Sequence, residues 1–363
     1  KQTHRVLFHS GATEGINLLV KGWALNLKKS KSSHNNFFYF SDVDHSAVWN
    51  LQDDLHLYAP ETISTNDEKN GKIKTVRIAV NSCGEYEFNY ELFASSNFGS
   101  SSGSNSASNV GSDLNLNINR LLNFTYVNNE TGVVNSLEKV VNLKQKYPEL
   151  LIHVDAVQLL GKVNNFKLLD PHIDFYTFSG HKFGALTGIG FSLIKKGTEK
   201  FIHPLITGGG QQSNLRSGSE NFYGVYSLMK ALQYLEKHFS YEEQLRAKKY
   251  FENELKKFLK DNNRGEIVGI DAKERDLTTI MFIVYDCKSD ILQMAFDLAG
   301  IDVSRGSACK AQTAEVSRVL LAMGYSVDMA KKAIRISFST YMTLKKAQQY
   351  FQKVKNILER FVK

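Results

Sequence analysis

The sequence predicts an α/β protein with an open, mostly parallel sheet covered by helices on both faces, followed by a smaller α+β domain. Two observations support this prediction. Over the first two hundred residues, short apolar runs rich in β-branched and aromatic residues alternate with amphipathic segments, as in βαβ units. From residue 221 onward the pattern changes to long charged helices mixed with a few apolar runs. We therefore expect a large domain over residues 1–220 and a small domain over residues 221–363.

The large domain is expected to contain the strands of the parallel sheet. They are RVLFH (5–9), FFYF (37–40), TVRIAV (75–80), LLNFTYV (121–127), LLIHVD (150–155), DFYTFS (174–179) and GIGFSLI (188–194). An amphipathic helix follows the first strand, with one apolar face formed by Ile16, Leu19, Val20, Trp23 and Leu27. Ligands of such sheets bind beyond the carboxyl ends of the strands. Residues directly after strands are therefore the candidates for a site.

The small domain is expected to contain two further strands, TTIMFIVYD (278–286) and KAIRISFS (332–339), and the helix DILQMAFDLAG (290–300). Its last helix should bury one apolar face. That face consists of Tyr350, Phe351, Val354, Ile357, Leu358 and Phe361. Residues 95–119 are rich in Ser, Asn and Gly and fit neither domain's pattern. We expect a flexible surface insertion there.

The composition excludes several classes of protein. The net charge of +8 is compatible with a nucleic-acid partner, but the lysines lie beside acidic residues on helices such as 245–261. We therefore expect solvated helix faces and no nucleic-acid partner. No apolar run reaches the roughly 18 to 20 residues of a membrane-spanning helix, and no signal-peptide pattern is present, which predicts a cytoplasmic protein without a membrane partner.

Lys182 is the first candidate for chemistry. It follows the expected strand 174–179, and Asp155 ends the expected strand 150–155, so an amine and a carboxylate would face one site from neighbouring strand ends. A lone loop lysine is usually only a solvated charge. Pyridoxal 5'-phosphate, however, requires such a pair: a lysine forms a Schiff base with its aldehyde, and a carboxylate keeps its pyridine nitrogen protonated. The pair therefore indicates a pyridoxal phosphate site.

A phosphate site is expected where the first strand passes into a helix. Gly11, Ala12 and Thr13 offer backbone N–H groups and a hydroxyl at the positive end of that helix. Further along, His45 follows a strand at a point where an imidazole can cover a cofactor ring, and Asn129 follows another strand. Both residues have plainer interpretations, as a helix-start histidine and as one of a pair of turn asparagines.

Eight motifs follow one another between residues 10 and 339. They are SGATEGIN, DHSAV, VNNETGVV, HVDAVQLLGK, SGHK, GGGQQSNLRSGSEN, SRGSAC and IRISFS. With this set the chain resembles the class V aminotransferase family, and specifically the NifS/IscS-type cysteine desulfurases. The resemblance implies the PLP-dependent transferase fold type I, a homodimer, and a sulfurtransferase that removes sulfur from L-cysteine.

The resemblance also implies which residues bind the cofactor. Lys182 would form the Schiff base, Asp155 would pair with the pyridine nitrogen, and Gln158 would bind the ring hydroxyl. His45 would stack on the ring and take part in catalysis. The implied phosphate ligands are Thr13, Ser179 and His181, together with Ser219 from the second subunit.

Two further residues are implied to handle the substrate. Asn129 would contact both cofactor and substrate, and Arg335 would bind the substrate carboxylate through its two-pronged guanidinium. No metal site is expected, because the three cysteines lie far apart and form no CxxC pair.

Cys309 defines the expected reaction. It follows Gly306, Ser307 and Ala308, which suggest a mobile loop, and Arg305 and Lys310 favour its thiolate. It resembles the cysteine that forms a persulfide in the family members with a longer active-site loop. The persulfide would then pass to an acceptor protein such as an iron–sulfur scaffold. Cys83 and Cys287 fit structural roles better, because the first precedes a glycine turn and the second closes an apolar strand.

The chain departs from the family pattern in two places near the site. Several dozen residues that precede SGATE in the family are absent, so we expect an N-terminal segment to be missing from the pocket. FGALTG (183–188) replaces an aromatic-Gly-Pro-basic sequence, which predicts an altered loop facing the partner subunit. The alternatives are another class V enzyme, such as a selenocysteine lyase or an aminotransferase, and a non-catalytic homologue that serves as a binding subunit.

Overall fold

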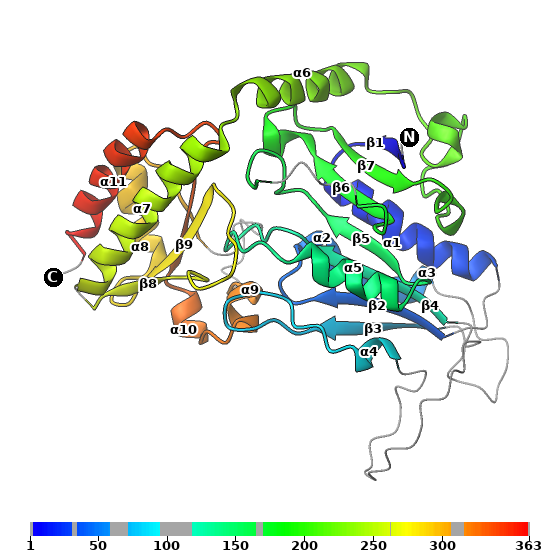
Figure 1. The fold of residues 1–363 in the computed structure, drawn as a ribbon, viewed down its shortest axis with the longest axis horizontal. Helices are drawn as coiled ribbons and strands as arrows, with labels where there is room; N and C mark the ends of the chain where they lie inside the picture. The colour runs from blue at the N-terminus through cyan, green and yellow to red at the C-terminus, as the bar shows by residue number, and fades with distance from the viewer. Residues whose placement is uncertain are drawn as a thin grey trace, which may run out of the picture.

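The computed structural model describes residues 3–30, 35–58, 72–94, 118–164, 170–261, 263–305 and 316–361. The strands are β1 (His4–His9), β2 (Asn35–Ser41), β3 (Ile73–Ile78), β4 (Ile118–Thr125), β5 (Leu151–Asp155), β6 (Phe175–Ser179), β7 (Gly190–Lys195), β8 (Gly265–Ile267), β9 (Thr279–Val284), β10 (Ser304–Arg305) and β11 (Ala333–Ser337). Figure 1 shows them as two separate sheets with helices packed around each.

The helices fall into two groups. Those of the large sheet are α1 (Ala12–Lys29), α2 (Ser46–Trp49), α3 (Leu51–Tyr58), α4 (Glu91–Ala94) and α5 (Leu137–Lys146), with the short 3-10 helix η1 (Gly180–Phe183). Those that follow along the chain are α6 (Phe222–His238), α7 (Tyr241–Asp261), α8 (Ser289–Leu298), α9 (Arg318–Ala322), α10 (Val327–Ala330) and α11 (Leu344–Leu358). In Figure 1, α6 runs along the top of the molecule, from the large sheet toward the small one.

The large sheet has the strand order β1-β7-β6-β5-β4-β2-β3. The five strands from β3 to β6 in this order are parallel, whereas β7 is antiparallel to both β6 and β1. All seven strands expected in the first part of the chain are present, so the prediction of a mostly parallel sheet is confirmed. Because parallel strands end at the same edge, β2, β4, β5 and β6 deliver their following residues to one side of the molecule.

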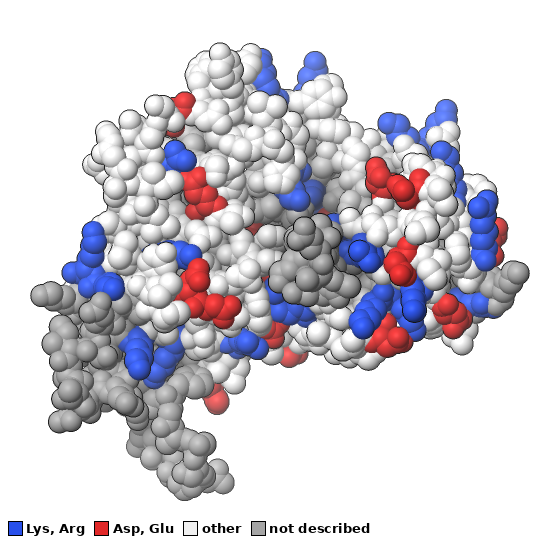
Figure 2. Space-filling view, turned by 180° about the vertical axis from the view of Figure 1, so that it is seen from behind, with Lys and Arg blue, Asp and Glu red and all other residues white. Residues whose placement is uncertain are grey.

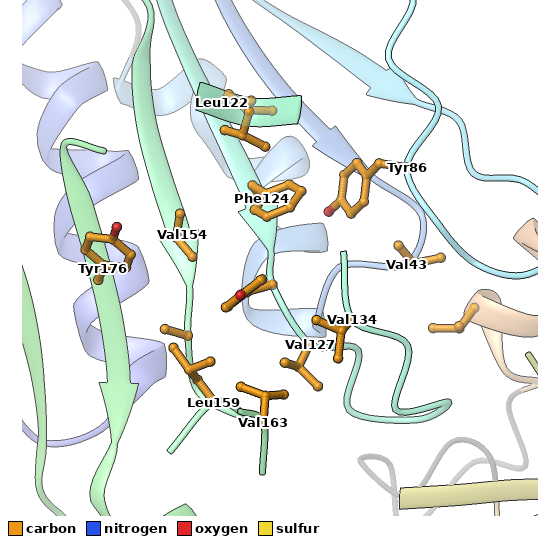
Figure 3. Packing of buried hydrophobic residues seen from close by; sticks show 14 of the residues in the cluster. Val43, Tyr86, Leu122, Phe124, Val127, Val134, Val154, Leu159, Val163 and Tyr176 are labelled. Atoms are coloured by element: carbon orange, nitrogen blue, oxygen red, sulfur yellow. The ribbon is translucent and has the colours of Figure 1, made fainter. Parts of the chain in front are cut away.

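Both faces of this sheet are buried, which explains why its strands read as nearly continuous apolar runs. On one face Leu121, Leu151 and Phe175 pack against α1, whose predicted apolar residues are all buried. On the other face Phe124 and Val154 pack with the residues shown in Figure 3. Side chains on opposite faces of these strands thus pack into two separate hydrophobic cores.

Close packing of α1 depends on a glycine. A Cβ at Gly22 would lie 2.6 Å from the carbonyl oxygen of His203, nearer than real Cβ atoms approach. The helix therefore lies against the backbone of residues 202–203, and its N-terminus is held at the end of β1. The turn in which the phosphate site is expected lies between β1 and the start of this helix.

The small sheet is antiparallel, in the order β10-β11-β9-β8. The expected strands and helix in this region are present as β9, β11 and α8. Phe351, Val354, Ile357 and Leu358 of α11 are buried as predicted. Tyr350 departs from the predicted face: it is 41% exposed, because it lies at the edge of the apolar stripe. Phe361 follows the end of α11 and is partly buried.

The expected boundary between residues 220 and 221 falls directly before α6. The two sheets share one hydrophobic cluster, in which Met281 and Ile283 of β9 join residues of the large sheet. The boundary itself stays a prediction. The expected insertion at 95–119 lies outside the described residues, except that Ile118 and Asn119 already belong to β4. None of the described helices is long and apolar enough to span a membrane.

Candidate active site

A cavity of about 650 Å³ opens at the carboxyl ends of β4, β5 and β6, where residues of the small sheet close it from the other side. The sequence-predicted residues among its lining are Ala12, Thr13, His45, Asn129, Asp155, Gln158, Ser179, His181, Lys182 and Arg335. Among the described residues, Ser219 is the one predicted site residue that does not line it. Cys309 lies outside the described residues. The fold thus gathers residues from both domains at one site.

Lys182 is held by a tight turn at the end of β6. The strand ends at Ser179, η1 follows directly, and Gly184 closes the turn with a φ of 99°. The amide of Gly180 donates a hydrogen bond to the carbonyl of Ile189 at 3.0 Å. A Cβ at Gly180 would lie 2.9 Å from that same oxygen, so the turn requires a glycine there. The side chain of Lys182 is exposed in the single chain.

Asp155 is a buried carboxylate at the end of β5. Its Oδ1 accepts a hydrogen bond from the amide of Val157 at 3.1 Å. Burial raises the pKa of Asp155 to about 7, and the charge of Asp44 adds to the rise. No lysine or arginine forms an ion pair with Asp155 in the described part of the chain. A positive group placed beside it would lower this pKa and restore the carboxylate.

The predicted phosphate site lies where β1 passes into α1. Gly11 precedes the helix, no side chain of the described residues caps its N-terminus, and Gly11, Ala12 and Thr13 line the cavity, so the backbone N–H groups of the first turn remain available to a ligand there. Ser179 Oγ and His181 Nδ1 are 3.0 Å apart and line the same cavity. Backbone donors, a hydroxyl and an imidazole thus share one wall.

For His45, the plainer interpretation is also correct. His45 is the N-cap of α2, and its Nδ1 accepts a hydrogen bond from the amide of Ala47 at 3.1 Å. Burial lowers the pKa of His45, and the charges of Lys182 and Arg318 lower it further, which favours the neutral imidazole. The histidine that begins α2 therefore also lines the cavity as an uncharged ring.

The two asparagines of VNNETGVV have different roles, one in a turn and one in the cavity wall. Asn128 forms the turn, since its Oδ1 accepts hydrogen bonds from the amides of Glu130 and Thr131, each at 2.9 Å. Asn129 lines the cavity, whereas Asn128 does not. The turn of Asn128 thus presents its neighbour to the site.

Arg335 lies on β11 and reaches the cavity from the small sheet. Its Nη1 donates to the carbonyl oxygen of Asn129 at 2.9 Å. Its Nε is buried and has no hydrogen-bond partner among the described residues. The guanidinium therefore retains donors for an anionic group in the cavity.

Four charged residues of the cavity were not found from the sequence: Asp44, Glu130, Lys162 and Arg318. Lys162 donates a hydrogen bond to Gln158, and Glu130 accepts one from Ser317 Oγ at 2.5 Å. Arg318 donates to the carbonyls of Asp42 and Asp44 at 2.8 and 2.6 Å. Asp44, Glu130 and Lys162 belong to the quoted motifs DHSAV, VNNETGVV and HVDAVQLLGK, so motif membership was the signal that could have found them. Arg318 stands in none, and its place depends on the docking of α9.

These contacts join the small sheet's helices to the large domain at the cavity. Burial raises the pKa of Glu130 to about 7, against the influence of Ser317 and of the neighbouring arginines. The guanidinium of Arg318 also lies over the ring of Trp49, 4.2 Å from its centroid. The beginning of α9 is thus fixed beside the segment that carries His45.

A chain of buried hydrogen bonds runs beneath the cavity. Asn123 Nδ2 donates to Asp44 Oδ2 at 2.9 Å, and His153 Nδ1 lies 2.7 Å from Asn123 Oδ1. Thr177 Oγ1 lies 2.8 Å from His153 Nε2 and 3.0 Å from Ser192 Oγ. We call Asn123, His153, Thr177 and Ser192 the inner row, and Thr125, Asp155 and Ser179, which follow two residues later on β4, β5 and β6, the outer row.

All hydrogen bonds of the inner row point the same way, each residue donating toward Asp44. The Asn123 amide nitrogen donates to a carboxylate, so its oxygen must accept from His153 Nδ1. Burial lowers the pKa of His153 to about 3, so the ring is neutral and its Nε2 accepts from Thr177. Because the Thr177 hydroxyl donates to His153, its oxygen accepts from the Ser192 hydroxyl. Ser192 Oγ in turn accepts from His9 Nε2 at 3.0 Å. No pattern in the sequence indicated this row.

The two other cysteines lie apart from this site. Cys287 is buried, and burial raises the pKa of its thiol, as expected of a structural cysteine. Cys83 is partly exposed.

Figure 2 shows that basic and acidic side chains are mixed over the face that it displays, with no large area of one sign.

Comparison with known proteins identifies the family. The Aminotransferase class-V family matches residues 101–349. Cysteine desulfurase 2 of Trichormus variabilis is 30% identical over 356 residues, which cover 98% of this chain and 78% of the relative. Cysteine desulfurase IscS of Dictyoglomus turgidum is 29% identical over 242 residues, 66% of this chain and 59% of the relative. The chain thus spans less than two thirds of this second relative.

Solved structures agree with the sequence matches. A NifS-like protein superposes with a TM-score of 0.74 at 26% identity and covers 98% of this chain and 82% of its own. The NifS-like protein of Rickettsia africae has a TM-score of 0.72 at 27% identity, with the same coverage. The chain therefore belongs to the aminotransferase class-V family, with its PLP fold type I. Within that family it is of the NifS/IscS cysteine desulfurase type, which confirms the resemblance of the eight motifs.

Proposed function

We propose that this chain is a pyridoxal phosphate-dependent cysteine desulfurase. It converts L-cysteine to L-alanine and transfers the sulfur to Cys309 as a persulfide, which supplies iron–sulfur cluster or other thio-cofactor assembly. One observation carries the proposal: Lys182 of η1, directly after β6, Asp155 of β5 and Arg335 of β11 line a single cavity.

The residues of the cavity suit pyridoxal phosphate. Asp155 is buried, with no cation beside it in the described part of the chain, and a protonated pyridine nitrogen is the partner that would keep it ionised. The N-terminus of α1 with Thr13, Ser179 and His181 offers donors to a phosphate, and Gln158 offers its amide to the ring oxygen. When bound, the cofactor supplies an electron sink for negative charge at the substrate Cα.

The chain's own residues would then handle protons and orientation. Arg335 binds the carboxylate of L-cysteine through the donors that the protein leaves unused. Lys182 Nζ takes the proton from the substrate Cα and returns protons later in the cycle. His45, held by its N-cap hydrogen bond and uncharged, would be the residue that covers the cofactor ring.

Cys309 is the proposed sulfur acceptor. Its thiolate attacks the substrate sulfur, the bond between that sulfur and Cβ breaks, and a proton replaces sulfur at Cβ. The balance is L-cysteine plus a protein thiol giving L-alanine plus a protein persulfide. The described residues on either side support this role. Arg305 ends β10, which pairs with the strand of Arg335, and Val316 lines the cavity, so the described residues nearest to Cys309 on both sides lie beside the site.

A homodimer is the proposed assembly. Leu186, Phe222 and Tyr223 are 58%, 70% and 79% exposed near the turn of Lys182, and exposed apolar side chains that gather in one patch are typical of a contact surface. The amide of Leu186 donates to Ser227 of α6, so these residues form one surface. Ser219 lies on the same part of the chain, outside its own cavity, which suits a residue that reaches the phosphate of a partner subunit.

The alternative reactions differ in what they require. An aminotransferase needs no loop thiol, whereas a selenocysteine lyase would prefer selenocysteine over cysteine. A non-catalytic homologue would have no need of the residues gathered here. An iron–sulfur scaffold is the proposed protein that receives the sulfur from the Cys309 persulfide. The cytoplasmic location stays a prediction.

The test is an anaerobic assay with L-cysteine and a thiol reductant that quantifies alanine and sulfide together. We expect equal amounts from the wild type, neither from Cys309→Ala, and wild-type amounts from the matched control Cys83→Ala. Selenocysteine in place of cysteine distinguishes the lyase. Unchanged sulfide release from Cys309→Ala would refute the persulfide step. A coloured protein that yields neither product would point to another pyridoxal reaction.

A further inference from the structure

Lys162 is a second lysine in the cavity, and the proposed reaction does not use it. It lies four residues after Gln158, in the turn that follows β5, and both side chains line the cavity. Its amine donates a hydrogen bond to Gln158 Oε1. Burial lowers the pKa of Lys162 to about 8; Asp276 opposes this shift, and the charges of Lys182 and Arg335 add to it. The amine is therefore mainly an ammonium at neutral pH.

The backbone of Lys162 is fixed from two sides. Its carbonyl oxygen accepts a hydrogen bond from the amide of Leu277 at 2.7 Å. The preceding Gly161 has a φ of 73°, and a Cβ there would lie 2.7 Å from Leu235 Cδ1 of α6. The ammonium is thus presented to Gln158 by a constrained turn that contacts the region before β9 and α6.

An ammonium determines how an amide is oriented. It has three donors and no acceptor, so it can face only the oxygen of the Gln158 amide, whatever other contacts that amide makes. The Gln158 amide nitrogen, with its two N–H donors, then points away from Lys162. Without Lys162, either end of the amide could face the ligand.

We propose that Lys162 is a positioning residue that holds the Gln158 amide so that Nε2, a donor, faces the ring oxygen of pyridoxal phosphate. This inference rests on the proposed function, in which Gln158 binds that oxygen. A donor stabilises the negative form of the ring oxygen. It thereby withdraws charge from the ring and lowers the proton affinity of the nitrogen that joins Lys182 to the cofactor.

The test is the pH titration of the absorbance of the bound cofactor in the full chain. We expect Lys162→Met to raise the midpoint by about one pH unit, as for the loss of one hydrogen bond worth about 1.4 kcal/mol. Lys162→Arg is the matched control, because it retains charge and donors and should keep the wild-type midpoint. Lys162→Gln is a second variant, also expected to raise the midpoint, in case the methionine variant does not fold.

A double-mutant cycle distinguishes positioning from a direct effect of the charge. If Lys162 acts through Gln158, the midpoint of the Gln158→Leu variant should not change when Lys162→Met is added. An equal shift in both backgrounds, or no shift in either, overturns the inference and leaves the proposed function intact. A wild-type chain that takes up no pyridoxal phosphate overturns the proposed function and the inference with it.

Discussion

Two neighbouring rows of polar side chains, on one face of the large sheet, use their hydrogen-bonding groups differently. The inner row bonds side chain to side chain across four strands. In the outer row, Thr125 Oγ1 donates to Asp44 Oδ1 at 2.7 Å and Ser179 has His181 as its partner, but Asp155 has one backbone donor and no cation among the described residues. Both rows are buried. The difference shows that burial of a polar group does not by itself indicate a binding site, whereas unused bonding capacity at a cavity wall does.

The largest effect is expected at the outer row. Asp155→Ala should reduce alanine formation by on the order of 100- to 1,000-fold, because the cofactor nitrogen would lose its negative partner. The free energy of unfolding of the cofactor-free chain should be unchanged or higher, since a buried carboxylate with a raised pKa is removed. Activity assays and urea unfolding check the two parts. A large loss of stability would mean that Asp155 is structural, like the inner row.

The pH dependence of stability should come from the outer row as well. The pKa of Asp155 is about 7 in the folded chain and near 4 when unfolded, so between these values the folded state holds a proton that the unfolded state lacks. The free energy of unfolding should therefore fall as pH rises from about 4 to 7, by a few kcal/mol at most. Asp155→Asn should flatten this fall, measured by urea unfolding at several pH values. The pKa of Glu130 is raised as well, so Glu130 adds a second fall of stability in the same pH range. Urea unfolding of Glu130→Gln measures the Glu130 contribution separately.

An inner-row substitution should act on stability first. His153→Leu leaves Asn123 Oδ1 and Thr177 Oγ1 without their buried partner, which should cost about 2–4 kcal/mol of unfolding free energy. Urea unfolding of the cofactor-free chain measures it. Full stability combined with lost cofactor absorbance would instead place His153 in the binding machinery.

The smallest effect is expected at the end of the inner row. Ser192→Ala removes one hydroxyl between Thr177 and His9, and should reduce the free energy of unfolding by about 1 kcal/mol. Cofactor affinity should not change, because Ser192 is not one of the described residues that line the cavity. A weaker affinity would show that the inner row also tunes the site.

Many features of the protein could be predicted from local sequence. The strands and α1 follow from runs and periodicities of a few residues, and all seven large-domain strands are present. Because the end of a strand marks the edge of a sheet, the positions of Asp155 and Lys182 along the chain were enough to assign them to one site. The prediction for Tyr350 was wrong, because periodicity alone does not define how far a helix is covered.

Tertiary structure alone decided the rest. The inner row reaches His9 because β1 lies beside β7 in the sheet, although the two strands are far apart along the chain. Arg318 reaches Asp42 and Asp44 across 274 or more positions, so no local pattern could place it. The sequence by itself determined which elements form and which residues follow strand ends, since these depend on neighbouring residues. The lateral order of strands and the docking of the small sheet determined which polar groups satisfy one another and which remain available to a ligand.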